Sequence, residues 1–266
     1  MSNENFDPKI PTNHPRFLSL QWRHKIIKGM RRLIVAEAGL IAHGRGECFD
    51  YILGEQTNKI AKKAIEAAVA LLLLAQHPVI SVNGNVVALC SKELTEFSKM
   101  INAPLEINLF YSKEGRVEAI KKELEDFGAI NILGTDERRM VEIKELSSNR
   151  RKVDVQGIEK ADVVFVPLED GDRTEALQKL GKKIIAVDLN PISRTSIWAD
   201  ITIVDNIIRV LPQMIEFAEK LKKLKKSELQ KIIHRFNNKK CIQRTLNLII
   251  DYIKKQKSIA FKILKD

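Results

Sequence analysis

Asp162-Val-Val-Phe-Val-Pro-Leu168 and Lys183-Ile-Ile-Ala-Val-Asp-Leu189 are the two stretches that decide the fold. Each is a continuous apolar run rich in Val and Ile rather than an alternation of apolar and polar residues. Strands that are covered on both faces of a sheet have this pattern. We expect a helix between them, over residues 173–180. Together they predict a strand–helix–strand unit with parallel strands.

The same alternation extends in both directions along the chain. Further apolar runs are expected as strands at residues 79–82, 105–109, 130–133 and 201–204. Helices are expected at residues 91–100, 116–127 and 207–221. This order predicts an α/β fold, a Rossmann-like doubly wound, mostly parallel sheet flanked by helices.

The N-terminal part differs from the rest in lacking strand signals. We expect a helix over about residues 16–33, a Gly-rich turn over residues 38–47, and an Ala/Leu-rich helix over residues 58–76. His77-Pro78 should end that last helix, because proline disfavours helical geometry in the residue before it. Only one sheet is needed, so residues 1–218 are expected to form one α/β ligand-binding domain.

Composition excludes several classes of protein. The chain has 266 residues, of which 44% are hydrophobic and 30% are charged, so it can bury a core. Its longest apolar run, residues 67–75, is far shorter than the ~20 residues that cross a bilayer. The start of the chain has no signal-peptide pattern, and three widely spaced cysteines make no CxxC pair. We expect a cytoplasmic protein without a membrane span, a disulfide framework or a thiolate zinc site.

The positive charge is confined to one end of the chain. Residues 219–266 contain 15 Lys and Arg against 4 Asp and Glu, an excess equal to the whole net charge of +11. Apolar residues recur there at three- and four-residue steps, which predicts amphipathic helices that Asn237-Asn238 separate. We expect this Lys-rich extension to pack its apolar face on the body or on a partner subunit. Nucleic acid is a less favoured partner.

Loops with polar residues follow five of the six expected strands. They are Asn83-Gly84-Asn85, Phe110-Tyr111-Ser112, Glu169-Asp170-Gly171-Asp172-Arg173-Thr174, Asp188-Leu189-Asn190 and Asp205-Asn206. Ligands of open α/β sheets bind at the carboxyl ends of the strands, so these loops predict one shared site. Asp, Asn and Gly are also common turn and N-cap residues, and that alternative stays open for any single loop.

No standard phosphate or catalytic signature is present. GxxxxGK[ST], HExxH and GxSxG are absent, and Gly44 and Gly46 lack the third glycine of a dinucleotide fingerprint. Cys48 could be a nucleophile beside His43, but a small buried thiol is the favoured interpretation. Arginines near expected turns suit phosphate or carboxylate binding, and Asp170, Asp172 and Asp188 could hold magnesium on a polyphosphate. Surface ion pairs and N-capping by Asp172 are the alternatives.

Seven blocks between residues 8 and 220 resemble a single family. In order they are His14-Pro15-Arg16, Ala38-Gly39-Leu-Ile-Ala-His43-Gly44-Arg45-Gly46-Glu47, Val79-Ile-Ser-Val-Asn83-Gly84-Asn85, Asn108-Leu-Phe-Tyr111, Val166-Pro-Leu-Glu169-Asp170-Gly171-Asp172-Arg173-Thr174-Glu175-Ala176-Leu177, Asp188-Leu-Asn190-Pro-Ile-Ser193-Arg194-Thr195 and Ile203-Val-Asp205-Asn206. On these blocks the chain resembles the archaeal phosphopantothenate synthetases, or 4-phosphopantoate–β-alanine ligases. The extension after residue 220 has no match in this resemblance.

The resemblance implies ATP-dependent joining of 4-phosphopantoate to β-alanine through an acyl-adenylate in coenzyme A biosynthesis. It implies ATP and Mg²⁺ as cofactors and a homodimer, with no residue assigned as a metal ligand. ATP is expected on Arg16, Gly39, Asp188, Leu189, Asn190, Arg194, Thr195, Asn206 and Ile207. The substrate 4-phosphopantoate is expected on Arg45, Asn83, Asn85, Asp170 and Arg173. His43 or Glu47 would take the amine proton in catalysis.

Two alternatives stay open at this point. The first is another nucleotide-dependent enzyme on the same sheet, since fold does not fix chemistry. The second is a non-catalytic nucleotide-binding protein whose basic extension binds polyanions.

Overall fold

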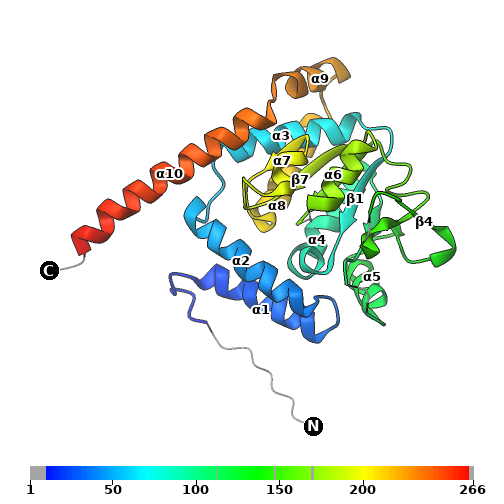
Figure 1. Cartoon of the computed structure of the whole chain (residues 1–266), viewed down its shortest axis with the longest axis horizontal. Helices are drawn as coiled ribbons and strands as arrows, with labels where there is room; N and C mark the ends of the chain where they lie inside the picture. Colours follow the sequence, from blue (N-terminus) through cyan, green and yellow to red (C-terminus); the bar gives the residue numbers. More distant parts are fainter. Residues whose placement is uncertain (1–9, 112, 147, 169–170, 264–266) are drawn as a thin grey trace, which may run out of the picture.

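The structure is a computed structural model that describes residues 10–111, 113–146, 148–168 and 171–263. Within these residues a six-stranded parallel sheet has the order β3-β2-β1-β6-β7-β8 (Figure 1). Its strands are β1 (Pro78–Val82), β2 (Leu105–Ile107), β3 (Ile132–Leu133), β6 (Val163–Pro167), β7 (Lys183–Val187) and β8 (Ile201–Ile203). The strand order reverses between β1 and β6, where doubly wound sheets bind their ligands. The expected fold class is confirmed.

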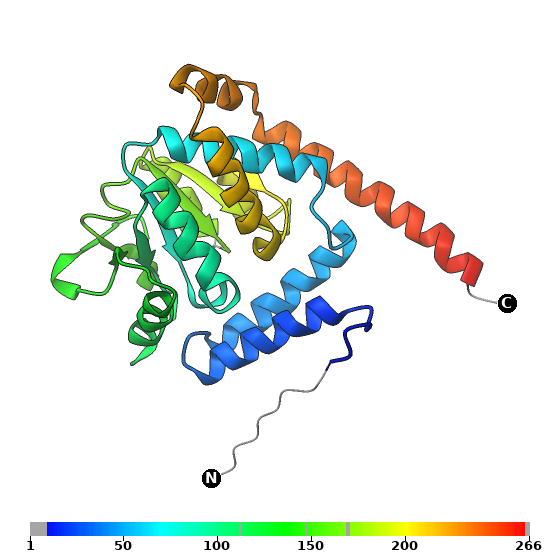
Figure 2. The ribbon, with the colours of Figure 1, turned by 180° about the vertical axis from the view of Figure 1, so that it is seen from behind.

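The continuous apolar runs arise because the sheet separates two cores. In β6, Val163 and Phe165 face one core, and Val164 and Val166 face the other. Helices α3, α4, α5 and α8 cover the first face, and α6 covers the second, as the two opposite views show (Figures 1 and 2). Every residue of the strand is therefore buried, which is why no polar alternation marks it.

The described helices flank the sheet and lie in the connections between its strands. They are α1 (Phe17–Arg31), α2 (Glu37–Leu53), α3 (Lys59–Leu74), α4 (Gly84–Ile101), α5 (Arg116–Asp126), α6 (Gly171–Lys179), α7 (Arg194–Trp198), α8 (Ile207–Leu221), α9 (Lys226–Arg235) and α10 (Asn238–Ile263). The connection from β3 to β6 holds an antiparallel pair and two short 3-10 helices: η1 (Glu137–Arg139), β4 (Met140–Glu142), η2 (Asn149–Arg151) and β5 (Lys152–Asp154).

The expected Gly-rich turn over residues 38–47 is wrong, because this segment lies inside helix α2. Gly39 does not form a turn; it lets the side chains of Asn85 and Val35 approach the α2 backbone closely. A Cβ there would lie 2.3 Å from Asn85 Oδ1 and 2.8 Å from Val35 Cγ1. Helix α2 instead ends at Gly54, whose φ of 84° provides the left-handed cap.

Helix α4 begins seven residues before the expected helix at residues 91–100, directly after β1. Asn83 caps it by accepting a hydrogen bond from the Val86 N–H group (3.2 Å). The helix is kinked at Cys90, where φ is −141°. The polar residues that follow β1 are therefore the first turn of a helix rather than a loop.

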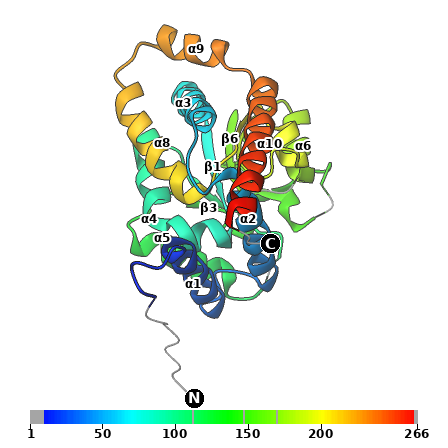
Figure 3. The same cartoon turned by 90° about the vertical axis from the view of Figure 1, so that its left-hand side faces the viewer.

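The C-terminal extension contains the end of α8 and two further helices, and the break between these two is at residues 236–237, one residue before the expected Asn237-Asn238. Helix α9 packs on α3, and Leu229 joins the main core. Helix α10 starts against β8, where Asn238 Oδ1 accepts from the Thr202 N–H group, and then extends beyond the body (Figures 1 and 2). In Figure 3 the same helix points toward the viewer. Packing on the body is confirmed for α9 and for the first part of α10. The described helices include no stretch long and apolar enough to cross a membrane.

Candidate active site

A cavity of about 570 Å³ lies at the carboxyl edge of the sheet. Its sheet-edge wall is formed by the residues that follow β1, β6, β7 and β8, among them Asn83, Leu168, Asp188 and Asn206. Its α2 wall is formed by Gly39, His43, Arg45, Gly46, Glu47 and Phe49. Leu109, Phe110 and Tyr111, which follow β2, also line the cavity. The residues after five separate strands thus converge on one cavity, as the sequences after these strands predict.

Asn83 joins the ends of two strands. Its Nδ2 donates to the carbonyl oxygens of Leu168 (2.8 Å) and Pro167 (3.3 Å), while its Oδ1 caps α4. Leu168 has a φ of 58°, a left-handed backbone that is uncommon for a leucine. The amide of Asn83 therefore holds the β6 loop where it enters the cavity.

Asp188 organises the turn after β7. One carboxylate oxygen accepts from the Asn190 N–H group (2.9 Å), and the other accepts from the Ser193 hydroxyl. Burial raises the pKa of Asp188, and the hydrogen bonds from Ser193 and Asn190 and the charge of Arg45 oppose that rise. Ser193 in turn caps α7, so the segment from Asp188 to Thr195 is held as a unit.

Arg194 is the first residue of α7 and lies at the rim of the cavity. Its side chain is 60% exposed and forms ion pairs with Asp172 and with Glu175 (2.6 Å). The guanidinium therefore rests on two carboxylates from the first turns of α6. Since exposed ion pairs are weak, a phosphate can exchange for them at low cost.

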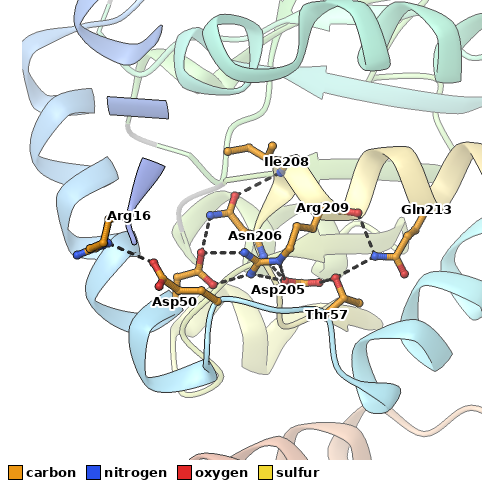
Figure 4. Close-up of polar contacts among 9 residues, drawn as sticks. Arg16, Asp50, Thr57, Asp205, Asn206, Ile208, Arg209 and Gln213 are labelled. Carbon is orange, nitrogen blue, oxygen red and sulfur yellow. Dashed lines mark hydrogen bonds and ion pairs between the residues drawn. The ribbon is translucent and has the colours of Figure 1, made fainter. Parts of the chain in front are cut away.

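Asn206 follows β8 and connects the cavity to residues behind it (Figure 4). Its Oδ1 accepts from the Ile208 N–H group (3.3 Å), and its Nδ2 donates to Asp50 of α2 (2.8 Å). Ile207 beside it is fully buried and lines the cavity with its neighbour.

The two acid–base candidates on α2 have different surroundings. Burial lowers the pKa of His43, although the charge of Glu47 opposes this, and His43 Nε2 has no hydrogen-bond partner among the described residues. Glu47 accepts from the Ser19 hydroxyl (2.6 Å) and from Arg23 Nε (2.8 and 2.9 Å). His43 is therefore neutral near pH 7, and the Glu47 carboxylate is held by α1.

Among the described residues, all those expected in the site line this cavity except two. Arg16 lies outside its lining, over the ring of Tyr51 (4.1 Å), and donates to Ser19 and Glu55. Arg173 is fully buried and donates to the Ser81 hydroxyl (3.0 Å). Asp170 lies outside the described residues.

Cys48 is exposed, so the expectation of a buried thiol is wrong. It lies on α2 but does not line the cavity. Cys48 therefore takes no part in the site described above.

Sequence reasoning missed two buried arginines that line the cavity. Arg116 begins α5 and donates to the Ile34 carbonyl oxygen (2.9 Å), and Arg150 lies in η2. The position of Arg116 after Gly115 was a usable signal, because arginine in a first helical turn suits an anion site. Arg150 carries no such signal, since it is brought to the cavity by the β4–β5 connection.

The cavity is suited to anionic ligands. Arg45, Arg116, Arg150 and Arg194 line it, whereas its carboxylates among the described lining residues are Glu47 and Asp188. The described residues contain no group of three or more His, Cys, Asp or Glu side chains that could hold a metal. An open parallel sheet with such an edge defines an α/β enzyme of the class that binds phosphate-bearing ligands.

Residues 60–252 match the family described as phosphopantothenate/pantothenate synthetase, and the chain belongs to this family. It is 54% identical to the 4-phosphopantoate–beta-alanine ligase of Thermococcus kodakarensis over 91% of this chain and 92% of the relative. It is 53% identical to the ligase of that name from Thermococcus onnurineus, covering 93% and 94%. The one from Methanosarcina mazei is 46% identical, covering 92% and 96%.

The family match changes one expectation about the extension. It continues to residue 252, so the expectation that the resemblance ends near residue 220 is wrong. Helix α9 and about half of α10 are therefore part of the family's sequence pattern. Their Lys-rich composition hid this, because a solvated helix face tolerates many polar residues.

Proposed function

We propose that this protein is an ATP-dependent 4-phosphopantoate–β-alanine ligase of coenzyme A biosynthesis. It joins 4-phosphopantoate to β-alanine and produces 4-phosphopantothenate, AMP and diphosphate. The observation that carries the proposal is its 46–54% identity, over more than nine-tenths of the chain, to three ligases of that name. The arginine-lined cavity at the sheet edge supports it independently.

The chemistry explains the need for such a cavity. A carboxylate is a poor electrophile, so its oxygen first attacks the α-phosphorus of ATP and diphosphate leaves. The β-alanine nitrogen then attacks the acyl carbon of the adenylate, AMP leaves, and a base takes the amine proton. Several anionic groups must be gathered in one place, which arginines and backbone N–H groups can do. Alignment of the reactants supplies much of the rate.

ATP binds along the sheet-edge wall in this proposal. Its contacts are Asp188, Leu189, Asn190, Arg194, Thr195, Asn206 and Ile207, with Gly39 opposite on α2; all of these line the cavity. An acidic side chain after a strand suits ribose hydroxyls, and Arg194 suits a phosphate. Arg16 stays in the proposal as a contact from outside the lining, and its role depends on movement of its side chain.

The acyl substrate binds along α2 in this proposal. Arg45 holds the phosphate of 4-phosphopantoate with a bidentate contact, and Asn83 and Asn85 also line the cavity. Asp170 and Arg173 remain proposed contacts, although Arg173 is fully buried. His43 is the proposed base, because a neutral imidazole can accept the amine proton, whereas Glu47 is paired with Arg23.

Mg²⁺ would enter this site with ATP. The described residues hold no cluster of candidate metal ligands, so the ion would be held mainly by the phosphate oxygens of ATP and by water, as is common for magnesium in proteins. The ion would neutralise charge on the diphosphate as it leaves. We also infer that the protein is cytoplasmic and that it forms a homodimer. Light scattering on the purified protein tests the homodimer.

The test is a three-substrate assay that measures AMP and diphosphate. Both should form only when ATP, 4-phosphopantoate and β-alanine are all present. Diphosphate release with unphosphorylated pantoate alone would indicate a different nucleotide-dependent enzyme. No turnover together with polyanion binding that falls steeply with salt and survives Arg194→Ala would indicate a binding protein.

A further inference from the structure

A buried ion-pair network behind the cavity joins α2 to the turn between β8 and α8 (Figure 4). Arg209 of α8 lies between two carboxylates. Its Nη2 is 2.5 Å from Asp50 Oδ1 and 2.6 Å from Asp205 Oδ1, and its Nη1 is 3.2 Å from Asp50 Oδ2. The network thus connects a helix near the N-terminus to a turn more than 150 residues later in the chain.

Both carboxylates are almost fully withdrawn from water. The side chains of Asp50 and Asp205 are 4% and 1% exposed, and that of Arg209 is 17% exposed. Asp205 also accepts from the Thr57 hydroxyl (2.5 Å), and Thr57 accepts from Gln213 (2.9 Å). A buried carboxylate with this many donors holds its neighbours in one geometry.

The network reaches the cavity through Asn206. Its Nδ2 donates to Asp50 Oδ2 (2.8 Å) and its Oδ1 accepts from Ile208, so the amide has one orientation. An amide nitrogen carries two hydrogens, so one remains for a ligand in the cavity. Asp50 therefore fixes a side chain of the sheet-edge wall while it sits on the helix that forms the opposite wall.

The other polar contacts of α2 join it to different elements. Asn85 Nδ2 donates to the Gly39 carbonyl oxygen (2.8 Å) and ties the first turns of α2 to α4. Glu47 ties the middle of α2 to α1 through Ser19 and Arg23. Asp50 ties the last turns of α2 to the strand edge where Asn206 lies.

We propose that Asp50 is a positioning residue for catalysis: through Asn206 and Arg209 it sets the distance and register between the α2 wall and the nucleotide-binding turn after β8. This inference rests on the proposed ligase function and adds a residue that does not line the cavity. Loss of the link leaves each wall intact but misplaces Asn206, so ATP binding is affected first.

The test uses the full-length protein and the variants Asp50→Asn and Arg209→Lys. Asp50→Asn places an NH₂ group against the donors of Asn206 and Arg209, and Arg209→Lys removes the guanidinium fork. Each is expected to raise the KM for ATP by about tenfold or more, and the double variant should be no worse than the more affected single one, since both break one unit.

Asp162→Asn is the matched control. Asp162 also joins two elements, because it accepts from the N–H groups of Gln76 (2.7 Å) and His77 (2.9 Å), but at the opposite edge of the sheet. It should lower the melting temperature and leave the KM for ATP unchanged. This separates positioning from a general loss of stability.

The outcomes distinguish the inference from the proposed function. Wild-type protein without three-substrate turnover overturns the proposed function. Active wild type together with a folded Asp50→Asn variant whose KM for ATP is within twofold of wild type overturns the inference. If Asp50→Asn does not fold, the test uses Asp50→Glu and two measurements: its KM for ATP and the shift in its melting temperature that ATP causes. If both equal those of the wild type, the inference is overturned.

Discussion

The sheet-edge wall and the α2 wall face each other across the cavity but are held by different kinds of contact. Strands, N-caps and short turns fix the first: Asn83 caps α4, Ser193 caps α7 and Asn206 caps α8. Ion pairs with distant residues hold the second, namely Glu47 with Arg23 and Asp50 with Arg209. The first wall therefore uses caps that join residues two or three positions apart, in addition to longer contacts, whereas the second relies on contacts between residues far apart in the sequence.

The difference shows how an α/β sheet acquires a second wall. A parallel sheet orients its loops without help, because the carboxyl ends of all strands meet at one edge. A helix has no such constraint and needs charged or close backbone contacts to stay in place. Substitutions in and near the two walls test this difference.

Gly84→Ala should push the two walls apart. A Cβ at Gly84 would lie 2.0 Å from the Ile34 carbonyl oxygen in the segment that leads into α2, and 2.9 Å from Arg116 Nη2. Backbone cannot move aside cheaply, so the free energy of unfolding should fall by more than about 3 kcal/mol in urea denaturation. Gly44→Ala is the control: nothing lies near its Cβ, so it should stabilise α2 by up to ~1 kcal/mol.

Glu106→Gln should remove a pH dependence of the free energy of unfolding. Glu106 lies in β2, within the sheet. Burial raises the pKa of Glu106 from 4.5 to about 7, opposed by hydrogen bonds from Ile158 and Asp154 and by the charge of Arg173. The folded state therefore holds a proton that the unfolded state has lost. Stability should decrease as pH rises from about 4.5 to about 7, by an amount on the order of 3 kcal/mol.

Urea denaturation between pH 4 and 8 measures this slope. It should flatten in Glu106→Gln, and the exposed Glu118→Gln should keep the slope of the wild type. An equal slope in all three proteins would contradict the assignment to Glu106.

Arg194→Ala should weaken ATP binding while the fold is retained. The side chain is 60% exposed, so its loss costs little packing, but one charge-assisted bond to phosphate is worth ~1.5–3 kcal/mol. The apparent ATP constant should rise about ten- to a hundred-fold in the three-substrate assay. Arg138→Ala, which removes another exposed arginine ion pair, should leave it unchanged. Wild-type ATP kinetics in Arg194→Ala would remove Arg194 from the site.

Truncation of the extension should have the smallest effect if only its distal part is removed. The described side chains after Asp251 lie mostly in solvent, so deletion of residues 254–266 should change the free energy of unfolding by less than about 0.5 kcal/mol. Deletion of residues 222–266 should instead lower stability but leave turnover measurable, because it removes Leu229 and Ile249. Ile249 packs in a cluster with Leu189, a lining residue. A stable but inactive long deletion would place the extension in the active site.

By itself the sequence determined the sheet, its flanking helices and the sheet-edge half of the site. Continuous apolar strands and the caps after them are local patterns, so Asn83, Asp188 and Asn206 are predictable from the sequence alone. The resemblance added the reaction, since long blocks with one order are specific to a family.

Only the tertiary structure decided what α2 is and what holds it. The glycines of residues 38–47 signal a turn in sequence, but packing against Asn85 and Val35 makes Gly39 a close-contact residue within a helix. The links from Asp50 to Arg209 and from Arg116 to Ile34 join residues 159 and 82 positions apart. Contacts at such separation leave no local pattern, because their partners are selected by the folded chain and not by sequence neighbours.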